Sequence, residues 1–375
     1  MTPAPVGLLA LTRPGFEVEC ATELEALAAA VAARATARVE PHSGRVMLEA
    51  ADARSAERLA ARAGVDETVF ARQLVVVRTV VRDLPRGARV EALVDAAAAH
   101  GPFAGPVLVE HADDDSGRRL AGLANALVAP LTGALGRAGL LVEDPARHRL
   151  HVVVLDTATC VVATSAPGRA SPWPGGVPRL RLPGRAPSRS ARKLEEALAC
   201  LLPPAVVERE LGPGTVAVDL GAAPGGWSWV LASRGARVIA VDRGPLKGAA
   251  AEAPSIEHRR VDAFTFRPEA RVDWLVCDVV DKPARVTELL AGWLREGRLR
   301  AMVFNLKLPM RQRHAAVEAC RARLEAATAA GAVEGTLRLK QLFHDREEVT
   351  GAWWSAERGR ARRATPRPVR RRRRS

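Results

Sequence analysis

The chain has 375 residues and a formal net charge of +14, and its length predicts two or three domains rather than one core. Residues 358–375 carry ten arginines and no acidic residue, so only +4 remains for the first 357 residues once those charges are removed. A mildly basic body with a strongly basic tail suits a polyanion such as RNA. The composition gives no support to a membrane protein or a disulfide-rich one.

The five cysteines are widely spaced and form no Cys-x-x-Cys pair, so the sequence indicates neither a zinc site nor a disulfide framework. The longest uncharged stretch, residues 120–136, contains Asn125 and Pro130 and is too short for a membrane span. No basic segment followed by a cleavable apolar run opens the chain. We therefore expect a soluble cytoplasmic protein with reduced core thiols, no metal and no membrane partner.

The first 165 residues predict two α+β units, of which the first covers residues 1–80 and the second residues 81–165. The patterns of the first unit predict strands at residues 7–12, 44–48 and 69–77 and helices at residues 16–33 and 55–63. Those of the second predict a strand, a long helix and two further strands, at residues 107–110, 118–138, 150–155 and 160–165. The second unit shows no obvious catalytic cluster.

A change of composition marks the connector over residues 166–190, which is rich in proline and arginine and contains no acidic residue. It is either a plain linker or a basic strap that faces RNA. A helix is expected over residues 191–202, with Ser190 as its N-cap and Lys193 in its first turn.

From residue 215 strands and helices alternate, which predicts a doubly wound α/β domain over residues 191–354. Strands are expected at residues 215–220, 236–241, 272–277 and 301–306, with helices at 227–234, 284–297 and 311–330. Residues 335–342 and 347–354 are expected to close the sheet as a hairpin around His344 and Asp345.

A turn rich in glycine follows the first of these strands, and ligands of open α/β sheets bind at such turns. The order Gly221-Ala-Ala-Pro-Gly225-Gly226 lacks the G-x-G-x-x-G spacing of a dinucleotide site. We expect the glycines to let the backbone approach the ligand closely. Asp242, Asp262 and Asp278 end later segments, and such a row of acids would repel a pyrophosphate but tolerate a sulfonium cation. S-adenosylmethionine is therefore the favoured ligand.

The sequence Asp219-Leu-Gly-Ala-Ala-Pro-Gly-Gly-Trp resembles the cofactor loop of the FtsJ-type RNA 2′-O-ribose methyltransferases. Further stretches resemble the branch of that family that modifies a 23S rRNA cytidine: Ala186-Pro-Ser-Arg-Ser-Ala-Arg-Lys, Val276-Cys-Asp-Val-Val-Asp-Lys-Pro, Phe304-Asn-Leu-Lys-Leu-Pro-Met and Leu342-Phe-His-Asp-Arg-Glu-Glu-Val-Thr. The resemblance covers nearly all of residues 8–350. It implies a Rossmann-like methyltransferase with a seven-stranded sheet, preceded by ferredoxin-like and THUMP modules.

The resemblance also implies a catalytic tetrad formed by Lys193, Asp278, Lys307 and Glu348, with Glu348 preferred to Glu347 because it directly precedes Val349. The cofactor contacts that it implies are Ser190, Gly221, Ala223, Pro224, Gly225, Gly226, Asp242, Asp262 and Asp278. The substrate would be 23S rRNA, naked or partly assembled, and a monomer is favoured.

Residues around Lys307 pull its pKa in opposite directions, because burial and Lys193 would lower it whereas Asp278 and Glu348 would raise it. Whether Lys307 is a true base or an orienting group stays open at this point. Glycine and two tryptophans follow Glu348-Val-Thr, so we expect the last strand to end early. Trp353 and Trp354 are candidates for stacking on RNA, and residues 355–375 are expected to be disordered.

Two alternatives accompany the methyltransferase hypothesis. The first is a non-catalytic RNA-binding or ribosome assembly factor with a vestigial methyltransferase domain. Lys307→Ala separates the two hypotheses, because only an enzyme would lose its function while keeping its cofactor. The second alternative, a nicotinamide-dependent dehydrogenase, is disfavoured by the glycine spacing.

Overall fold

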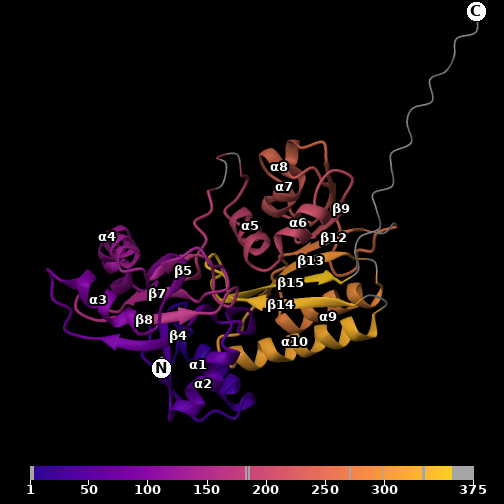
Figure 1. The fold of residues 1–375 in the computed structure, drawn as a ribbon. Coiled ribbons are helices and arrows are strands. Elements are labelled where there is room, and N and C mark those ends of the chain that lie inside the picture. The colour runs from indigo at the N-terminus through magenta and orange to yellow at the C-terminus, as the bar shows by residue number, and fades with distance from the viewer. Residues whose placement is uncertain are drawn as a thin grey trace, which may run out of the picture.

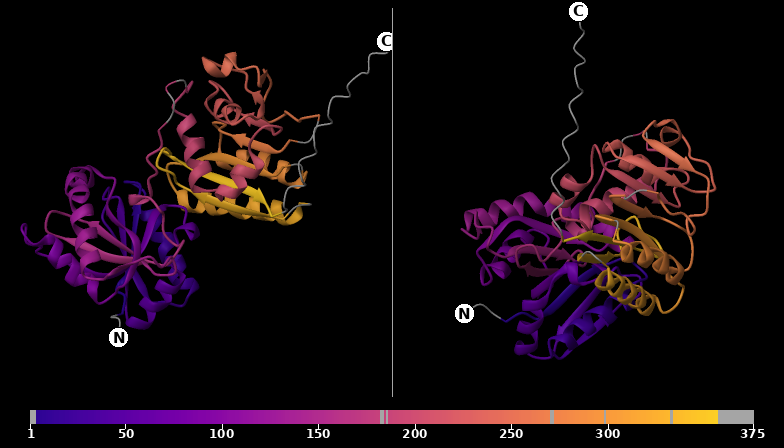
Figure 2. Two further views of the ribbon diagram at one scale, coloured as in Figure 1. Left: turned by 45° about the horizontal axis from the view of Figure 1, so that its top comes forward. Right: turned by 90° about the vertical axis from the view of Figure 1, so that its right-hand side faces the viewer.

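The computed structural model describes residues 4–356 apart from residues 182–183, 185, 270–271, 298 and 332–333. Two lobes are visible, one built from the N-terminal half and one from the C-terminal half (Figures 1 and 2). Most of the arginine-rich tail, from residue 357 onward, lies outside the described residues. The expectation of disorder there is therefore not tested.

A single eight-stranded sheet runs through the N-terminal lobe, in the order β2-β3-β1-β4-β8-β7-β5-β6. The elements of its first part are β1 (Gly7–Thr12), α1 (Glu17–Ala30), β2 (Ala35–Val39), β3 (Arg45–Ala50), α2 (Ala53–Arg62), η1 (Val65–Glu67) and β4 (Ala71–Val81). Those of its second part are α3 (Arg89–Ala98), β5 (Phe103–His111), α4 (Asp115–Arg137), β6 (Leu141–Val142), β7 (Arg149–Val154) and β8 (Cys160–Ser165). The predicted strands and helices are all present, and β2, α3 and β6 are additional.

The two N-terminal units join edge to edge through β4 and β8. These strands are antiparallel, and Val76 lies opposite Thr164. β4 is long enough to pair with β1 along its first half and with β8 along its second half. The expected division near residue 80 thus falls at the end of a strand that both units share.

The first part of the connector is fastened to this sheet. Ser171 N–H donates to Gln73 Oε1 at 2.9 Å, and Gln73 Nε2 donates to the Ser171 carbonyl at 3.3 Å. Gly175, in η2 (Pro174–Gly176), donates its N–H to Glu110 Oε2 at 2.6 Å. Gln73, Glu110 and Ser171 are all buried, so residues 171–175 form a packed segment and not a free linker.

The C-terminal lobe contains a seven-stranded sheet in the order β11-β10-β9-β12-β13-β15-β14, which confirms the predicted doubly wound architecture. Its strands are β9 (Val216–Leu220), β10 (Arg237–Val241), β11 (Ile256–Arg259), β12 (Trp274–Cys277), β13 (Ala301–Lys307), β14 (Gly335–Lys340) and β15 (Glu348–Ser355). Its helices are α5 (Ala191–Cys200), α6 (Pro204–Glu210), α7 (Gly226–Ser233), α8 (Ala249–Glu252), α9 (Pro283–Arg295) and α10 (Arg313–Ala330). β15 is antiparallel to both of its neighbours, whereas β9 to β13 are parallel.

Helices cover both faces of this sheet, which is why its strands are almost continuously apolar. Successive strand residues point to opposite faces. Trp274 and Val276 of β12 therefore pack with α5, α6 and α7, while Leu275 and Cys277 pack with α9 and α10. Because both faces are buried, only the strand ends are free to carry polar site residues.

The last strand continues through Trp353 and Trp354 to Ser355, so the expectation that it ends early is wrong. β15 lies between β13 and β14, and Trp353 and Trp354 are only 3% and 9% exposed. The idea that these two tryptophans stack on RNA is therefore wrong as well. The central position of the strand buries the aromatic rings, and Arg338 lies over the Trp354 ring.

Contacts with the N-terminal lobe concentrate on the hairpin of β14 and β15 and on the start of α10. Gln341 N–H donates to the Val69 carbonyl at 2.8 Å, and Lys340 Nζ donates to the Thr68 carbonyl at 2.8 Å. Arg313 donates to the Gly15 carbonyl at 3.1 Å. The two lobes thus meet beside the strand that begins with Glu348.

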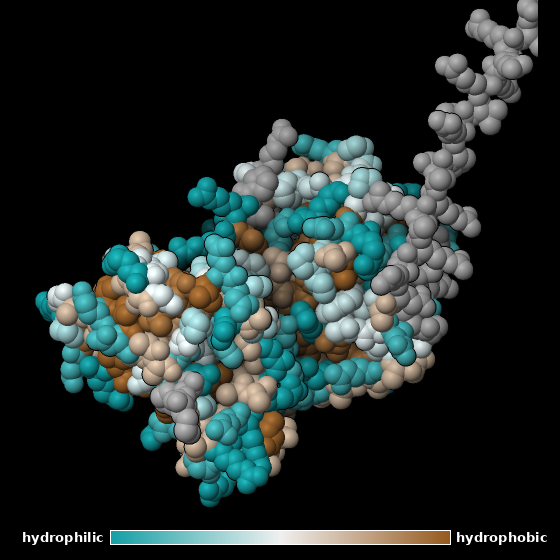
Figure 3. Space-filling model, in the orientation of Figure 1, coloured by the Kyte–Doolittle hydropathy of each residue, from teal (hydrophilic) through white to brown (hydrophobic). Residues whose placement is uncertain are grey.

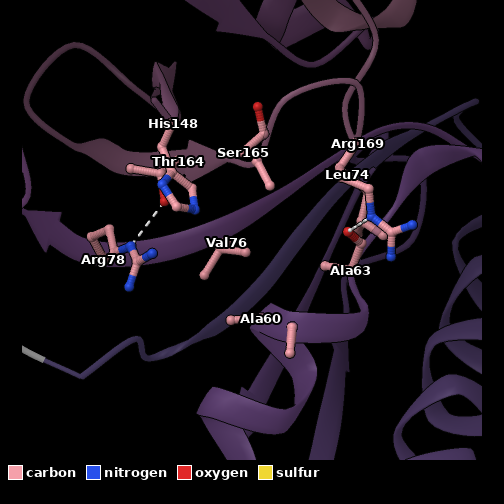
Figure 4. A pocket seen from close by; sticks show the side chains of 11 residues that line it. Ala60, Ala63, Leu74, Val76, Arg78, His148, Thr164, Ser165 and Arg169 are labelled. Atoms are coloured by element: carbon pink, nitrogen blue, oxygen red, sulfur yellow. Dashed lines mark hydrogen bonds between the residues drawn. The ribbon is translucent and has the colours of Figure 1, made fainter. Parts of the chain in front are cut away.

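The surface mixes hydrophilic and hydrophobic residues, with hydrophobic residues gathered over the lobe that holds α3 and α4 (Figure 3). A cavity of about 180 Å³ lies between α2 and the N-terminal sheet, where Arg78 Nε donates to Thr164 Oγ1 at 2.8 Å (Figure 4). No predicted site residue lines it. Within the described residues, no helix is long and apolar enough to cross a membrane.

Candidate active site

A cleft of about 370 Å³ opens at the carboxyl ends of β9, β10 and β12. This is the edge where ligands bind in open α/β sheets. Five of the predicted cofactor residues line it: Gly221, Ala223, Asp242, Asp262 and Asp278. Val261, Phe264, Val279 and Arg285 also line it and were not predicted. Arg285 lies 3.9 Å over the Phe264 ring, and the only sequence signal for this wall is that Phe264 follows Asp262 by two residues.

The remaining predicted cofactor residues lie around the glycine turn without lining the cleft. Ser190 occupies the N-cap position of α5 and makes no capping bond, and its hydroxyl is hydrogen-bonded to Ser188 Oγ at 2.6 Å. The Ser190 carbonyl accepts from Trp227 Nε1 at 2.9 Å. Pro224 accepts a backbone bond from Lys247. These contacts hold the turn against the start of α5.

The glycines of the turn are required by the protein itself. A Cβ at Gly225 would lie 2.4 Å from Ala250 Cβ, and the φ of Gly225 is +111°. A Cβ at Gly226 would lie 2.3 Å from Ser190 Oγ, and one at Gly221 would lie 3.0 Å from Val279. Neighbouring protein atoms therefore already exclude side chains at these positions, and close approach of a ligand to the turn stays a prediction.

Carboxylates shape the bottom and the rim of the cleft. Asp242 accepts the N–H of Ala223 at 2.9 Å and that of Gly244 at 2.7 Å, so it holds the glycine turn. Asp262 pairs with Arg243 at 2.8 Å. Asp219 is fully buried, and burial raises its pKa to about 7, although Ser228 Oγ donates to its Oδ2 at 2.6 Å.

The four tetrad residues meet at one point beside the cleft. Lys307 Nζ donates to Asp278 Oδ1 at 2.8 Å and also binds Glu348 Oε2. Lys193 Nζ, from the first turn of α5, binds the other oxygen of the same carboxylate, Glu348 Oε1. Asp278, which follows β12, also lines the cleft and so connects the tetrad to the predicted cofactor site.

Strand register separates the two adjacent glutamates. Glu348 lies opposite Lys307 in the ladder of β13 and β15, and only 8% of its side chain is exposed. Glu347 instead pairs with Arg313 at 2.8 Å, and 61% of its side chain is exposed. The geometry therefore places Glu348 and not Glu347 in the cluster.

The opposing influences on Lys307 have a net direction. Burial is the largest of them and lowers its pKa, but Asp278 and Glu348 together raise that pKa above the ordinary lysine value. Burial likewise raises the pKa of Glu348, but Lys307 and Lys193 outweigh it and lower that pKa below its usual range. Both residues are therefore charged at neutral pH.

Residues behind the tetrad complete a hydrogen-bond network that the sequence did not reveal. Asn305 Nδ2 donates to Asp278 Oδ1 at 3.0 Å, and Thr350 Oγ1 lies 2.7 Å from Asn305 Oδ1. The buried Glu196 accepts from the backbone N–H groups of Phe343 and His344, and so holds the loop before Glu348. Asn305 precedes Lys307 by two residues in the same strand, which is the one signal available beforehand.

The cleft is compatible with S-adenosylmethionine. Asp242, Asp262 and Asp278 provide acceptors and a negative field suited to ribose hydroxyls and a sulfonium. Val261, Phe264 and Val279 offer an apolar wall for an adenine ring. The buried Asp219 Oδ1 has no hydrogen-bond partner among the described residues, and it lies at the end of the strand that leads into the turn.

Comparison with known proteins identifies this arrangement. Sequence models of three families match successive parts of the chain: the RlmM ferredoxin-like domain over residues 6–75, the N-terminal region of ribosomal RNA large subunit methyltransferase M over residues 88–166, and the FtsJ-like methyltransferase over residues 186–360. The fold, the strand-end site and the last match define the C-terminal lobe as an FtsJ-like methyltransferase domain.

Curated relatives extend the similarity to nearly the whole chain. Ribosomal RNA large subunit methyltransferase M of Thauera aminoaromatica is 42% identical over 349 residues, which cover 92% of this chain and 95% of that protein. The protein of the same name from Xanthomonas campestris pv. campestris (strain B100) is 43% identical over 346 residues, covering 92% and 98%. The chain therefore belongs to the ribosomal RNA large subunit methyltransferase M family.

Solved structures show more distant likenesses. Aeropyrum pernix fibrillarin, in complex with S-adenosyl-L-methionine, is 18% identical and matches 47% of this chain and 85% of its own, with a TM-score of 0.34. The fibrillarin pre-rRNA processing protein of Methanococcus jannaschii is 15% identical and matches 56% and 84%, with a TM-score of 0.35. At this level of similarity we draw no conclusion about ligand or activity.

Proposed function

We propose that the protein transfers the methyl group of S-adenosylmethionine to the ribose 2′-hydroxyl of a cytidine in 23S rRNA. The observation that carries this proposal is the junction of Lys193, Asp278, Lys307 and Glu348 in one ion-paired cluster beside the cofactor cleft. The names of the curated relatives, which are methyltransferases of large-subunit ribosomal RNA, support the choice of substrate.

Bound S-adenosylmethionine would supply an electrophilic methyl group on sulfur, so the proposed reaction needs no metal ion. Asp242 and Asp262 would hold its ribose and the neighbourhood of its adenine, and Gly221 and Ala223 would provide the backbone around it. The buried Asp219 lies beneath the turn, and its Oδ1, which has no partner among the described residues, could accept a hydrogen bond from the cofactor. Ser190 and Pro224 to Gly226 would support the turn rather than touch the ligand.

Lys307 is the residue that we assign to the hydroxyl. Its raised pKa keeps it protonated, so we propose an orienting and charge-stabilising role in place of a resting-state base. Two of its N–H bonds are directed to Asp278 and Glu348, and the third would be donated to the 2′-oxygen. A preorganised donor of this kind stabilises negative charge that develops on oxygen, and removing one costs about 10² to 10³ in rate elsewhere.

The hydroxyl proton leaves as the oxygen–carbon bond forms, because an ether oxygen that still carries a proton is strongly acidic. The carboxylates that flank Lys307 are the basic atoms of the cluster, and one of them would accept this proton. Lys193 holds one oxygen of Glu348 and thereby fixes the other toward Lys307. The four residues are therefore expected to act as a coupled unit.

Exposed arginines of the connector and of the first turn of α5 support an RNA substrate. Arg179, Arg181, Arg189 and Arg192 are exposed. None of them forms an ion pair or side-chain hydrogen bond with a described residue. Arg192 precedes Lys193 in the first turn of α5, so a phosphate bound at Arg192 would lie on the helix that carries one tetrad residue. The reading of the connector as a basic strap is therefore the one we propose.

The proposal extends to the division of the chain. We assign a ferredoxin-like module to residues 1–80, a THUMP-like RNA-binding module to residues 81–165, the connector to residues 166–190 and the methyltransferase to residues 191–354. We also propose that the enzyme works as a cytoplasmic monomer on naked or partly assembled rRNA, since a nucleotide buried in a finished subunit would be hard to reach.

Mapping of ribose methylation in 23S rRNA from cells with and without the gene tests the substrate. Loss of one 2′-O-methylcytidine, restored by the wild-type gene but not by a Lys307→Ala allele, is the expected result. An unchanged map would overturn the rRNA assignment. If Lys307→Ala complemented fully, the protein would be an RNA-binding or assembly factor rather than an enzyme.

A further inference from the structure

A buried hydroxyl behind the tetrad has more acceptors than it has hydrogens. Thr350 Oγ1 lies 2.7 Å from Asn305 Oδ1, 3.0 Å from Asp345 Oδ1 and 2.9 Å from Asp345 Oδ2. All three residues are completely buried. A threonine hydroxyl carries one hydrogen, so it donates to only one of these oxygens.

The direction of the chain follows from its far end. Asn305 Nδ2 donates to Asp278 Oδ1 at 3.0 Å, which leaves Asn305 Oδ1 facing Thr350. The reversed amide would place its oxygen against a carboxylate oxygen, where no hydrogen is available. Thr350 must therefore donate its single hydrogen to Asn305 Oδ1.

The near end then requires a second hydrogen. With its own hydrogen given to Asn305, Thr350 Oγ1 presents only lone pairs to Asp345. Asp345 Oδ2 already accepts the N–H of Leu342 at 2.9 Å, so a proton on Oδ1 satisfies every atom of the group. An ionised Asp345 would instead place a buried charge against lone pairs.

We propose that a protonated Asp345 starts a hydrogen-bond chain through Thr350 and Asn305, and that these three are positioning residues that fix the Asp278 carboxylate for methyl transfer. This inference rests on the proposed function, since Asp278 matters as a member of the tetrad. Asn305 and Lys307 both donate to Asp278 Oδ1. No described residue is hydrogen-bonded to Asp278 Oδ2, so that oxygen stays available to a ligand in the cleft that Asp278 lines.

The surroundings of Asp345 agree with this protonation state. Burial and the charge of Glu348 raise its pKa to about 8. Glu196 on α5 also raises this pKa, while the N–H of Leu342 opposes the rise. Arg72 on β4 is the cation that faces it from the N-terminal lobe.

Substitutions that change one atom test the chain. Thr350→Val removes the hydroxyl at nearly constant volume, and we expect kcat for 23S rRNA to fall about tenfold to a hundredfold, as misplaced catalytic groups do. The KM for RNA should stay within about twofold, because the exposed arginines proposed to bind RNA are untouched. Thr350→Ser should restore most of the rate. A wild-type kcat in Thr350→Val would overturn the inference.

The protonation state has its own comparison. In Asp345→Asn an amide N–H replaces the proposed carboxyl O–H and the amide oxygen keeps the Leu342 bond, so this variant should retain far more activity than Asp345→Ala. Equal losses in the two variants would show that the ionised carboxylate is needed, and would overturn the chain as drawn.

A measurement without activity keeps the two proposals distinguishable. Because the pKa of Asp345 is raised on folding, the folded state binds the extra proton between pH about 4 and 8, and stability falls as pH rises through that window. Urea unfolding of wild type and Asp345→Asn across this range should show a shallower fall in the variant. Identical slopes in the two proteins would overturn the protonated Asp345, whatever the methylation assay shows. Absence of 23S rRNA methylation by wild type would instead overturn the proposed function.

Discussion

Lys307 and Glu348 are cross-strand partners at the last position of the ladder between β13 and β15. Their ion pair is therefore set by strand register, which also fixes the six preceding pairs back to Ala301 and Trp354. A slip of one residue would turn Glu348 away from the site and bring Glu347 toward it. The proposed chemistry thus depends on the register of two strands as much as on the identity of four residues.

Glu348→Gln and Glu347→Gln form a matched pair that tests this dependence. We expect Glu348→Gln to lower kcat about 10²-fold or more, because Lys307 and Lys193 lose their shared anion. Glu347→Gln should stay within about twofold of wild type, since its partner Arg313 lies outside the tetrad. Methyl incorporation into 23S rRNA is the measurement. A larger loss in Glu347→Gln would place the wrong glutamate in the cluster.

The same cluster should make stability depend on pH with a defined sign. The lowered pKa of Glu348 contributes stability that is present above pH about 4.3 and is lost as pH falls through the folded pKa. The raised pKa of Lys307 contributes stability that is present below pH about 10.4 and is lost as pH rises through its folded pKa. We expect Glu348→Gln to cost about 3 kcal/mol at pH 7, as for a buried ion pair that loses one member.

At pH about 3 the difference between wild type and Glu348→Gln should shrink, because wild type is then losing the glutamate charge as well. Urea unfolding at the two pH values gives both numbers. A cost that stayed constant between them would show that the pair contributes nothing through its charge.

Gly225 offers a test of the turn that surrounds the proposed cofactor site. Gly225→Ala combines a φ of +111° with a Cβ 2.4 Å from Ala250 Cβ, so we expect a loss of about 2 kcal/mol and weaker S-adenosylhomocysteine binding. Adding Ala250→Gly should recover part of the loss, because it removes the contact but not the backbone strain. Gly122→Ala in α4 is the control, as its Cβ meets no atom within 4 Å.

Calorimetry and thermal unfolding would measure both effects. No recovery in the double variant would mean that the backbone conformation alone requires the glycine.

If the exposed arginines near the start of α5 bind RNA, their removal should lower the affinity for RNA and leave the affinity for the cofactor unchanged. Arg189→Ala with Arg192→Ala should weaken binding of a 23S rRNA fragment and lower the slope of log affinity against log salt by about 0.7 for each lost phosphate contact. S-adenosylhomocysteine affinity should not change. Arg54→Ala is the matched control, because Arg54 is exposed, has no ion-pair partner among the described residues and lies on α2. Equal effects of the control and the double variant would show that these two arginines contribute only general positive charge and no specific RNA contact.

Strong periodicity made most of the fold predictable from the sequence. The buried strands β9, β10, β12 and β13 read as apolar runs because both faces of the sheet are covered. β2 was missed because its residues are mostly half-exposed or exposed, so the run Ala35–Val39 carries little hydrophobic signal. α8 and β11 were missed because four residues are too few to show a period.

The site was predictable to the extent that it lies at strand ends. The positions of Asp278 and Lys307 followed from the βαβ alternation, and the family resemblance added Lys193 and Glu348. The burial of Trp353 and Trp354 was not predictable, because it depends on β15 lying between β13 and β14. The Asp345–Thr350–Asn305 contacts could not be predicted either, since they cross from a turn to two strands.

The hydrogen bond from Gln341 to Val69 joins the two lobes and so fixes the separation between them. On the N-terminal side, β4 begins two residues after Val69. On the C-terminal side, the hairpin reaches Glu348 seven residues after Gln341. An RNA bound by the N-terminal lobe would therefore reach the tetrad at a fixed distance from its binding site. Choice of nucleotide would then follow from the folded shape of the RNA over that span, with little need to read its bases.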